Sequence, residues 1–409
     1  MEVKESSIKN VFLSRPAFIC GIGDSGEPEK FVRNFSSGFR GGIKKIDCGV
    51  AGEGGAKSFF VGKIDDDRLP PCDDKFNLRT LRLLNAVFPH IRPVVEKAVA
   101  LYGKERVGVC IGSCDNGSSL SFQAHKSFFE NGFFPDDYDL RVQGADYPAC
   151  YTARKFALEG PCLAFSTACS SSASAIIKAK ELIKSGLCDA VIAGGVDVTS
   201  DIVLLGFDSL GAVSGGMTNP FSKNRDGINL GEGAGVFLLS KDDLDETGIV
   251  LAGTGESSDA SHPTAPLADG SGARQAMEAA LRDGNLSPAE IDYVNFHGTG
   301  TNLNDSMEGK AVALVFGDYK VAASSSKPMT AHTLGASGSL ELAICFHAIK
   351  SRRLPVHLWD GEQDSDIPVL NIVTPDNMEK LVAGREIRCC MSNSFAFGGC
   401  NVSLVIKKL

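Results

Sequence analysis

Three residues with side chains suited to nucleophilic chemistry lie at the ends of apolar, element-forming runs. Cys169 lies among small residues in FSTACSSSASA, His297 follows an apolar run in NFHGTGTNLND, and His332 lies in SSSKPMTAHTLGASGSLE. A thiol becomes a strong nucleophile once it is ionised, and imidazole donates or accepts protons near neutral pH. These residue types indicate a reaction in which a covalent bond forms to the cysteine while the histidines handle protons and developing charge.

A helix must follow Cys169 directly. Apolar residues recur at helical spacing over 173–183, lysines occupy the other face, and Gly186 is suited to end the helix. The residues 162–165 follow a Gly-Pro pair and are expected to form a short buried strand, which places Cys169 in a tight strand-to-helix turn. The first amides of a helix lack internal partners and carry partial positive charge, so we expect a lowered thiol pKa and a place for an oxyanion. With 13 cysteines in the chain, a small buried hydrophobe is the structural alternative.

The histidines differ in what surrounds them. Four are expected to be surface or packing residues because they have no catalytic neighbours, namely His90, His125, His347 and His357. His297 is followed by a cluster of hydroxyl, amide and acidic residues, namely Thr299, Thr301, Asn304, Asp305 and Glu308. His332 lies between Lys327 and Glu341 in a polar segment. Strand ends collect catalytic groups in α/β proteins, although each histidine alone also fits a structural role.

The composition limits the function classes. The chain has 409 residues, with 43% hydrophobic and 22% charged residues, as in an ordinary globular protein. No apolar run reaches the roughly 18 to 20 residues of a membrane span, and the first residues lack the pattern of a signal peptide, so we expect a cytoplasmic protein without membrane association. The cysteines show no paired zinc spacing, so no metal is expected, and the net charge of −9 disfavours nucleic-acid binding.

The order of strand-like and helical runs predicts an α/β fold in two halves. Strand-like runs such as RVGVCIGS and DAVIAGGVDV alternate with helices to about residue 240, and a second series follows KDDLDETG. We expect residues 1–250 to form an N-terminal half with the cysteine and residues 251–409 to form a C-terminal half with the histidines. The segments after Cys169 and from His332 begin alike, which is a faint sign of internal duplication.

A second enzyme class has to be weighed because of the segment GIGDSG at 21–26. It matches the glycine pattern of NAD(P)-binding oxidoreductases and is followed by an acidic residue, Asp47, about 20 positions on. Three glycines in six residues arise easily in a chain with 45 glycines, however, and the sequence after Asp47 does not resume a βαβ pattern. The dinucleotide interpretation is therefore disfavoured.

Six segments in order resemble a known family. The segments STACSSS, NPFSKNRDGINLGEGAGVFLL, SSDASHPTAPLADG, HGTGTNLND, SSKPMTAHTLGASGSLE and SNSFAFGGCN are similar to the signatures of the decarboxylating β-ketoacyl-acyl-carrier-protein synthases of the type I and II group. The resemblance implies a thiolase-type fold, with two related halves in a five-layered αβαβα body. It further implies an acyltransferase that condenses an acyl thioester with malonyl-carrier protein in fatty acid or related polyketide or polyene synthesis. Acyl carrier protein would be the partner, and no cofactor would be needed beyond its phosphopantetheine arm.

The resemblance also implies roles for matched residues. Cys169 would carry the acyl group, and His297 and His332 would donate hydrogen bonds to the enolate oxygen. The amides of Cys169 and Phe397 would form a second oxyanion hole, and Phe397 would act as a gate. Lys327 and Glu341 would form an ion pair that orients the histidines. Two groups complete the site: acidic residues behind His297, namely Asp305 and Glu308, and residues along the substrate tunnel, namely Thr264, Thr299, Thr301 and Phe395.

The chain departs from the family pattern at several positions. Ala331 and Ala396 stand where glycine is usual, before the histidine and before the gating phenylalanine, and Cys400 stands where threonine is commoner. We expect Ala396 to slow or reshape the gate. Asp115 places a polar group near a position where family members have an apolar or small pocket residue, so a specialised acyl substrate is open.

The resemblance also implies surfaces that bind partner proteins. The family forms dimers, either of one chain or with a related ketosynthase-like chain. A noncatalytic chain-length partner on the same fold is the third candidate function, but such partners usually lack the nucleophile. Carrier proteins are acidic, and Lys75, Arg79 and Arg82 are spaced to share one helical face, which we expect to be a docking patch.

Overall fold

The computed structural model describes residues 8–48, 57–115, 117–136 and 138–409. Within these residues, thirteen strands form one mixed sheet in the order β14-β13-β12-β15-β16-β11-β1-β10-β8-β6-β7, with β2 paired to β10 and β3 paired to β2. A second sheet has the order β4-β5-β9. The strands of the first half and the small sheet are β1 (Phe12–Leu13), β2 (Ala17–Cys20), β3 (Gly23–Asp24), β4 (Ile43–Asp47), β5 (Ser58–Gly62), β6 (Val107–Gly112), β7 (Cys162–Phe165), β8 (Ala190–Asp197), β9 (Leu230–Gly231) and β10 (Gly233–Ser240). The remaining strands are β11 (Ile249–Ser258), β12 (Tyr293–Asn295), β13 (Ala322–Ser324), β14 (Asn371–Ile372), β15 (Cys389–Phe395) and β16 (Cys400–Lys408).

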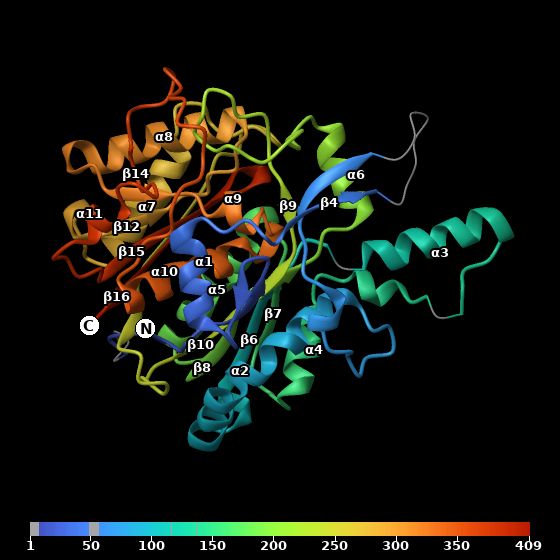
Figure 1. Ribbon diagram of the computed structural model, residues 1–409. Helices are drawn as coiled ribbons and strands as arrows, with labels where there is room; N and C mark the ends of the chain where they lie inside the picture. Colours follow the sequence, from blue (N-terminus) through green and yellow to red (C-terminus); the bar gives the residue numbers. More distant parts are fainter. Residues whose placement is uncertain (1–7, 49–56, 116, 137) are drawn as a thin grey trace.

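The two halves repeat one strand arrangement. In the first half β6 lies parallel between β7 and β8, and β10 runs antiparallel beside β8. In the second half β12 lies parallel between β13 and β15, and β16 runs antiparallel beside β15. The short strand β1 joins the halves because Phe12 pairs with Ser240 of β10 and with Val250 of β11. The α/β class and the internal duplication are thus both visible in the topology (Figure 1).

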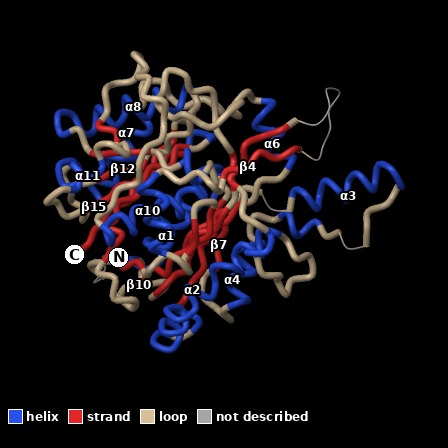
Figure 2. The backbone as a smooth tube through the Cα atoms, in the orientation of Figure 1, coloured by secondary structure: helices blue, strands red, loops and turns tan. Residues whose placement is uncertain are grey.

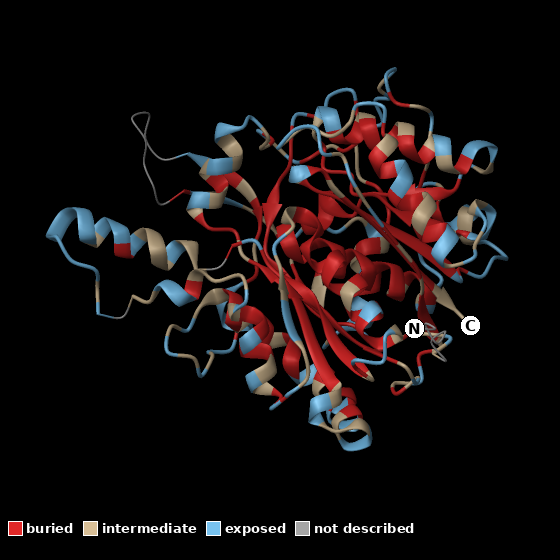
Figure 3. Ribbon diagram, turned by 180° about the vertical axis from the view of Figure 1, so that it is seen from behind, coloured by how far each residue is buried: buried red, intermediate tan, exposed pale blue. Residues whose placement is uncertain are grey.

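Helices cover and separate the strands of the two halves. The helices are α1 (Pro28–Ser37), α2 (Arg79–Tyr102), α3 (Ser118–Asn131), α4 (Tyr147–Lys155), α5 (Ser171–Lys184), α6 (Asp201–Ser209), α7 (Ser271–Asp283), α8 (Asn302–Phe316), α9 (Lys327–Thr330), α10 (Ser337–Ser351) and α11 (Met378–Val382). α5 and α10 pack against each other and against the strands of both halves, in the central part of the body where helices and strands alternate (Figure 2). Their residues are mostly buried, and the centre of the molecule is buried throughout in Figure 3. α2 and α4 cover the other face of the first half, and α7 and α8 cover that of the second. This is the layered arrangement of the thiolase-type fold.

Two expectations about local structure were wrong. β7 is an edge strand, and Cys162 and Leu163 on it are exposed instead of buried. Lys75 lies before α2, which begins at Arg79, so the three cations do not share one helix. The segment 21–26 forms part of the antiparallel hairpin β2–β3 and does not open a parallel βαβ unit, which agrees with the sequence argument against a dinucleotide site there.

The described helices include none that is both long enough and apolar enough to cross a lipid bilayer.

Candidate active site

The nucleophile candidate lies in a sharply bent turn between β7 and α5. A short 3₁₀ turn, Ala168–Ser170, precedes α5, and Ala168 adopts a positive φ of 50°. The Ser171 hydroxyl accepts a hydrogen bond from the Thr167 amide at 2.9 Å and donates to the Ala168 carbonyl at 2.6 Å. These local bonds hold the turn, and Cys169 is only 6% exposed at its tip. The position ahead of a helix agrees with the sequence prediction.

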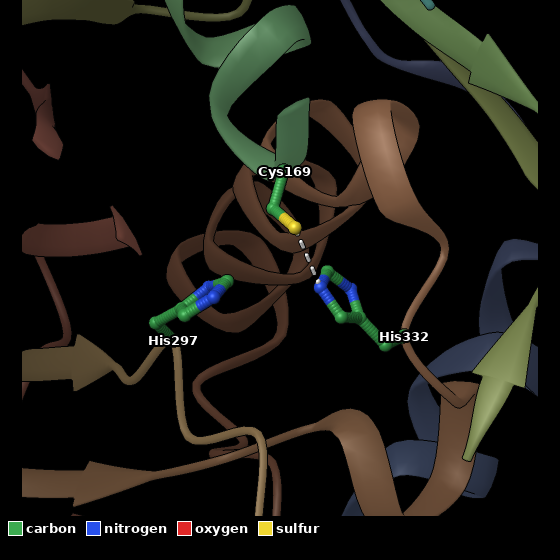
Figure 4. Close-up of side chains that lie close together, drawn as sticks. All are labelled: Cys169, His297 and His332. Carbon is green, nitrogen blue, oxygen red and sulfur yellow. Dashed lines mark hydrogen bonds between the residues drawn. The ribbon is translucent and has the colours of Figure 1, made fainter. Parts of the chain in front are cut away.

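The cysteine and both histidines meet in one place (Figure 4). Cys169 Sγ lies 3.0 Å from Nε2 of His332, and the rings of His297 and His332 lie 5.4 Å apart, nearly perpendicular. His297 follows β12, and His332 lies between α9 and α10, so two different elements of the second half bring the rings to the cysteine of the first half. The sequence prediction that these three residues form one site is consistent with this geometry.

Buried charged groups hold the loop of His297. Glu308 accepts hydrogen bonds from the backbone amides of His297 and Gly298, each at 2.7 Å. Asp305 accepts one from the Phe221 amide at 2.8 Å. The Lys327 ammonium binds both the His297 carbonyl and the Glu341 carboxylate, and all of these carboxylates are buried. The ion pair and the acidic residues therefore fix the histidine through its backbone.

Burial changes the ionisation of every group in the cluster. It raises the pKa of the Cys169 thiol to about 12, against the opposing effects of Lys327 and of the Phe397 amide, which hydrogen-bonds the sulfur. Burial, with Lys327 nearby, also holds the pKa of both His297 and His332 well below the usual range. The expectation of a lowered thiol pKa was therefore wrong in direction, because desolvation outweighs the helix amides. The thiol and both rings are therefore uncharged at neutral pH.

A cavity leads from the surface to this cluster. Cys169, His297 and His332 lie in its wall together with all four residues predicted for the substrate tunnel, namely Thr264, Thr299, Thr301 and Phe395. The hydroxyls of Thr299 and Thr301 are 2.9 Å apart. Phe397 also lines the cavity and stacks on Phe207 at a ring distance of 5.8 Å. The predicted residues thus surround one continuous space.

Sequence reasoning missed other residues of the cavity wall. His262 lines the cavity, and its Nδ1 accepts hydrogen bonds from the amides of Thr264 and Ala265 at 3.1 and 3.0 Å. It therefore shapes the loop that carries Thr264, and its position two residues before Thr264 was the available signal. Apolar side chains from α6 and α8, Phe207, Leu210 and Leu303, were also missed because nothing in their sequence context marks a cavity.

The departures from the family pattern have different structural consequences. Ala331 has φ 60° and ψ 176°, a combination that favours glycine. Ala396 has φ −102° and ψ 155°, which any residue adopts, so its methyl group strains no backbone there. Cys400 is the first residue of β16. Asp115 is buried and accepts a hydrogen bond from the Ser118 amide at 3.2 Å, but it does not line the cavity.

The predicted docking patch is largely occupied by contacts within the chain. Arg79 Nε and Nη2 donate to the buried carboxylate of Glu232 at 2.7 and 2.6 Å. Arg82 donates to the carbonyls of Asp66 and Leu69 at 3.0 and 2.7 Å. Lys75 is exposed and lies over the ring of Phe76. Arg79 and Arg82 are thus structural cations, and of the three residues Lys75 is the one that presents its charge to solvent.

The same cluster also satisfies the chemistry of a metal site. One donor atom from each of Cys169, His297 and His332 lies within 4.8 Å of the others, and thiolate and imidazole are ligands of zinc. The absence of a metal from the working site therefore stays a prediction.

Comparisons with known proteins define the family. The β-ketoacyl synthase N-terminal domain matches residues 96–244, and the β-ketoacyl synthase C-terminal domain matches residues 249–358. The chain belongs to the β-ketoacyl synthase family. It is 38% identical over 313 residues to nodulation protein E of Rhizobium meliloti (strain 1021), covering 74% of this chain and 76% of that protein.

Two further relatives span more of the chain. The 3-oxoacyl-[acyl-carrier-protein] synthase 2 of Vibrio harveyi is 35% identical over 400 residues, covering 92% of this chain and 89% of that protein. Among solved structures, a ketosynthase in complex with its chain length factor from Xenorhabdus doucetiae superimposes with a TM-score of 0.88 at 35% identity, covering 98% of both chains.

Proposed function

We propose that this chain is a 3-oxoacyl-[acyl-carrier-protein] synthase that extends an acyl chain by decarboxylative Claisen condensation. The observation that carries the proposal is the meeting of Cys169, His297 and His332 at one cavity, with Cys169 Sγ 3.0 Å from His332. The Vibrio harveyi relative bears the name of this activity. The substrates would arrive on the phosphopantetheine arm of acyl carrier protein, and no further cofactor is required.

The first half-reaction transfers the acyl group to the enzyme. The Cys169 sulfur attacks the thioester carbonyl carbon, the carbon–sulfur bond to pantetheine breaks, and the thiol proton ends on the released pantetheine sulfur. Because the thiol is protonated at neutral pH, its proton must leave as the attack proceeds. The backbone amides of Cys169 and Phe397 would bind the oxyanion of the tetrahedral intermediate.

The second half-reaction builds the carbon–carbon bond. Malonyl-carrier loses carbon dioxide, and the bonding electron pair moves into an enolate whose oxygen receives hydrogen bonds from His297 and His332. The enolate carbon attacks the acyl carbon, the bond to Cys169 breaks, and the thiolate takes up a proton from solvent water. Both rings are held neutral by burial, so each has one N–H to donate and one lone pair.

The proposal also assigns roles to the residues of the substrate tunnel and a class of pathway to the reaction. Thr299, Thr301 and Thr264 would hydrogen-bond the pantetheine arm, and Phe395 and Phe397 would flank the acyl group, with Phe397 as the gate. We propose that the reaction belongs to fatty acid synthesis or to a related polyketide or polyene pathway, and the name 3-oxoacyl-[acyl-carrier-protein] synthase 2 of the Vibrio harveyi relative supports the reaction type. A noncatalytic chain-length partner is not favoured, because this chain keeps the nucleophile and both histidines in contact.

Substitution of single residues separates the two half-reactions. Cys169→Ala should abolish acyl-enzyme formation and condensation yet still release carbon dioxide from malonyl-carrier. His332→Ala and His297→Ala should still accept an acyl group, at least slowly, while decarboxylation falls by on the order of 10²-fold or more. Mass spectrometry of the protein reports acylation, and carbon dioxide release is measured alongside. Condensation by Cys169→Ala, or parent rates of decarboxylation in both histidine variants, would contradict the assigned roles.

We also propose that the chain works as a dimer, either with itself or with a related ketosynthase-like chain. Two features of the first half support this. β7 is an open sheet edge with Leu163 37% exposed. α3 projects from the body (Figure 1), and it carries exposed aromatic side chains. Four phenylalanines in and after α3 are exposed, namely Phe128, Phe129, Phe133 and Phe134. Such edges and aromatic surfaces are usually covered by a partner.

Sedimentation velocity tests the dimer. The parent should sediment as a dimer at micromolar concentration, or copurify with a second chain of this family. Phe129→Asp should weaken the association, whereas Leu314→Asp, at another solvent-exposed apolar site on α8 of the other half, should not. A monomeric parent without a copurifying chain would refute the proposal.

A further inference from the structure

The two ring nitrogens of His332 have different neighbours. Nε2 faces Cys169, whereas Nδ1 lies 2.9 Å from the hydroxyl oxygen of Ser337, the first residue of α10. That hydroxyl in turn lies 3.2 Å from the hydroxyl of Thr333. Ser337 and Thr333 are 1% and 2% exposed. The polar atoms therefore form one continuous series of hydrogen bonds from Thr333 through Ser337 and His332 to Cys169. This series has little access to water.

The number of hydroxyl hydrogens determines which atom donates in each of these hydrogen bonds. Each hydroxyl has one hydrogen to donate, and among the hydrogen bonds of the described residues the Thr333 hydroxyl has Ser337 as its side-chain partner. If Thr333 donates to Ser337 and Ser337 donates to Nδ1, both hydroxyl hydrogens have acceptors. The proton of the ring is then on Nε2. The opposite direction leaves the buried Thr333 hydrogen without an acceptor, which is unfavourable.

We propose that Ser337 is a positioning residue that holds His332 as the Nε2–H tautomer. This inference rests on the proposed function and assigns His332 a fixed task within it. With Nδ1 accepting from Ser337, Nε2–H points toward Cys169 and is a permanent donor. It stabilises the sulfur as its negative charge develops and, in the second half-reaction, donates to the thioester oxygen.

The two histidines are then not equivalent. Nδ1 of His297 is buried and has no hydrogen-bond partner among the described residues, so nothing there selects one tautomer of that ring. His332 cannot accept the Cys169 proton at Nε2 because that nitrogen already carries one. His297, whose donor atom also lies near Cys169, is the ring left to accept the proton and return it to the departing pantetheine sulfur.

The first test observes the tautomer directly and needs no substrate. The full-length protein is labelled with ¹⁵N-histidine, and His332→Gln identifies the signals of His332 by their loss. The parent and Ser337→Thr, which keeps a hydroxyl, should show an unprotonated Nδ1 and a protonated Nε2. Ser337→Ala should show a mixture of tautomers. A protonated Nδ1 in the parent, or an unchanged tautomer in Ser337→Ala, would overturn the proposal.

The second test measures the consequence for the reaction. Ser337→Ala should decarboxylate malonyl-carrier about 10- to 100-fold more slowly, by analogy with the loss measured for hydrogen-bond partners of metal-ligating histidines. Alkylation of Cys169 by iodoacetamide should slow as well. Ser337→Thr should recover both rates to within about threefold. Parent rates in Ser337→Ala would refute the positioning role.

Ser339→Ala is the matched control. Ser339 is equally buried in the same turn of α10, but its hydroxyl donates to the Ala336 carbonyl at 3.0 Å and does not contact the histidine. The tautomer signals and rates of Ser339→Ala should match those of the parent. A loss of rate equal to that of Ser337→Ala would assign the effect to helix packing and overturn the proposal. If the parent itself releases no carbon dioxide, the proposed function fails, while the tautomer measurement still decides the role of Ser337.

Discussion

Arg79→Glu should destabilise the fold, because this cation pairs with a fully buried carboxylate. The guanidinium donates two hydrogen bonds to Glu232, at 2.7 and 2.6 Å, and the Glu232 side chain has no exposed surface. Removing one partner of a buried pair costs about 3–5 kcal/mol, because it leaves an uncompensated charge. Lys63, at 3.1 Å from Glu232, offsets part of that loss, whereas the new carboxylate adds repulsion. We expect a loss of at least about 3 kcal/mol.

Urea unfolding of Arg79→Glu and Lys75→Glu tests this reasoning. Lys75 carries the same charge four residues earlier, is exposed, and forms no ion pair with the described residues, so Lys75→Glu should change the free energy of unfolding by less than about 0.5 kcal/mol. If Lys75 contributes to docking, its reversal raises KM for carrier-bound substrates and leaves small pantetheine thioesters unaffected. An Arg79→Glu protein that unfolds at the parent urea concentration and has a raised KM would refute the structural assignment and restore Arg79 as a docking residue.

Two further measurements test the site. The rate of Cys169 alkylation should rise about tenfold per pH unit from pH 7 to 9 without a plateau, because burial raises the thiol pKa to about 12; a plateau below pH 8 would show a lowered pKa. Gly231→Ala would place a methyl carbon 2.9 Å from the Ala331 methyl, so it should cost about 1–3 kcal/mol in urea unfolding. Ala331→Gly should recover most of that loss in the double variant, and simple additivity would contradict the contact.

The sequence was sufficient for the parts of the site that depend on local pattern. Cys169 ahead of a helical repeat, and His297 at the end of an apolar strand, could be placed because strands and helices have distinct periods and because catalytic groups gather where they end. The ordered motifs then indicated the fold, and with it the contact between Cys169 and His332, which are 163 positions apart.

Features that depend on long-range packing could not be predicted from the sequence. The pKa of Cys169 was expected to fall because the helix start is visible in the sequence, whereas the burial that raises it comes from the second half of the chain. Arg79 looked like a surface cation because its partner, Glu232, is 153 positions away. The strand 162–165 has an apolar pattern that fits a buried strand, but its place at the sheet edge is a property of topology.

The distribution of charge explains how one cavity can serve both half-reactions. The thiol and both histidines are neutral, and the nearby ammonium of Lys327 is bound to Glu341, whose own pKa burial raises to about 7. The first half-reaction develops negative charge on the sulfur, and the second moves the charge of the malonyl carboxylate to the enolate oxygen. In both cases the charge lies near that ammonium and near N–H donors that need not reorganise. In a buried site such fixed donors stabilise a developing charge far more than water does.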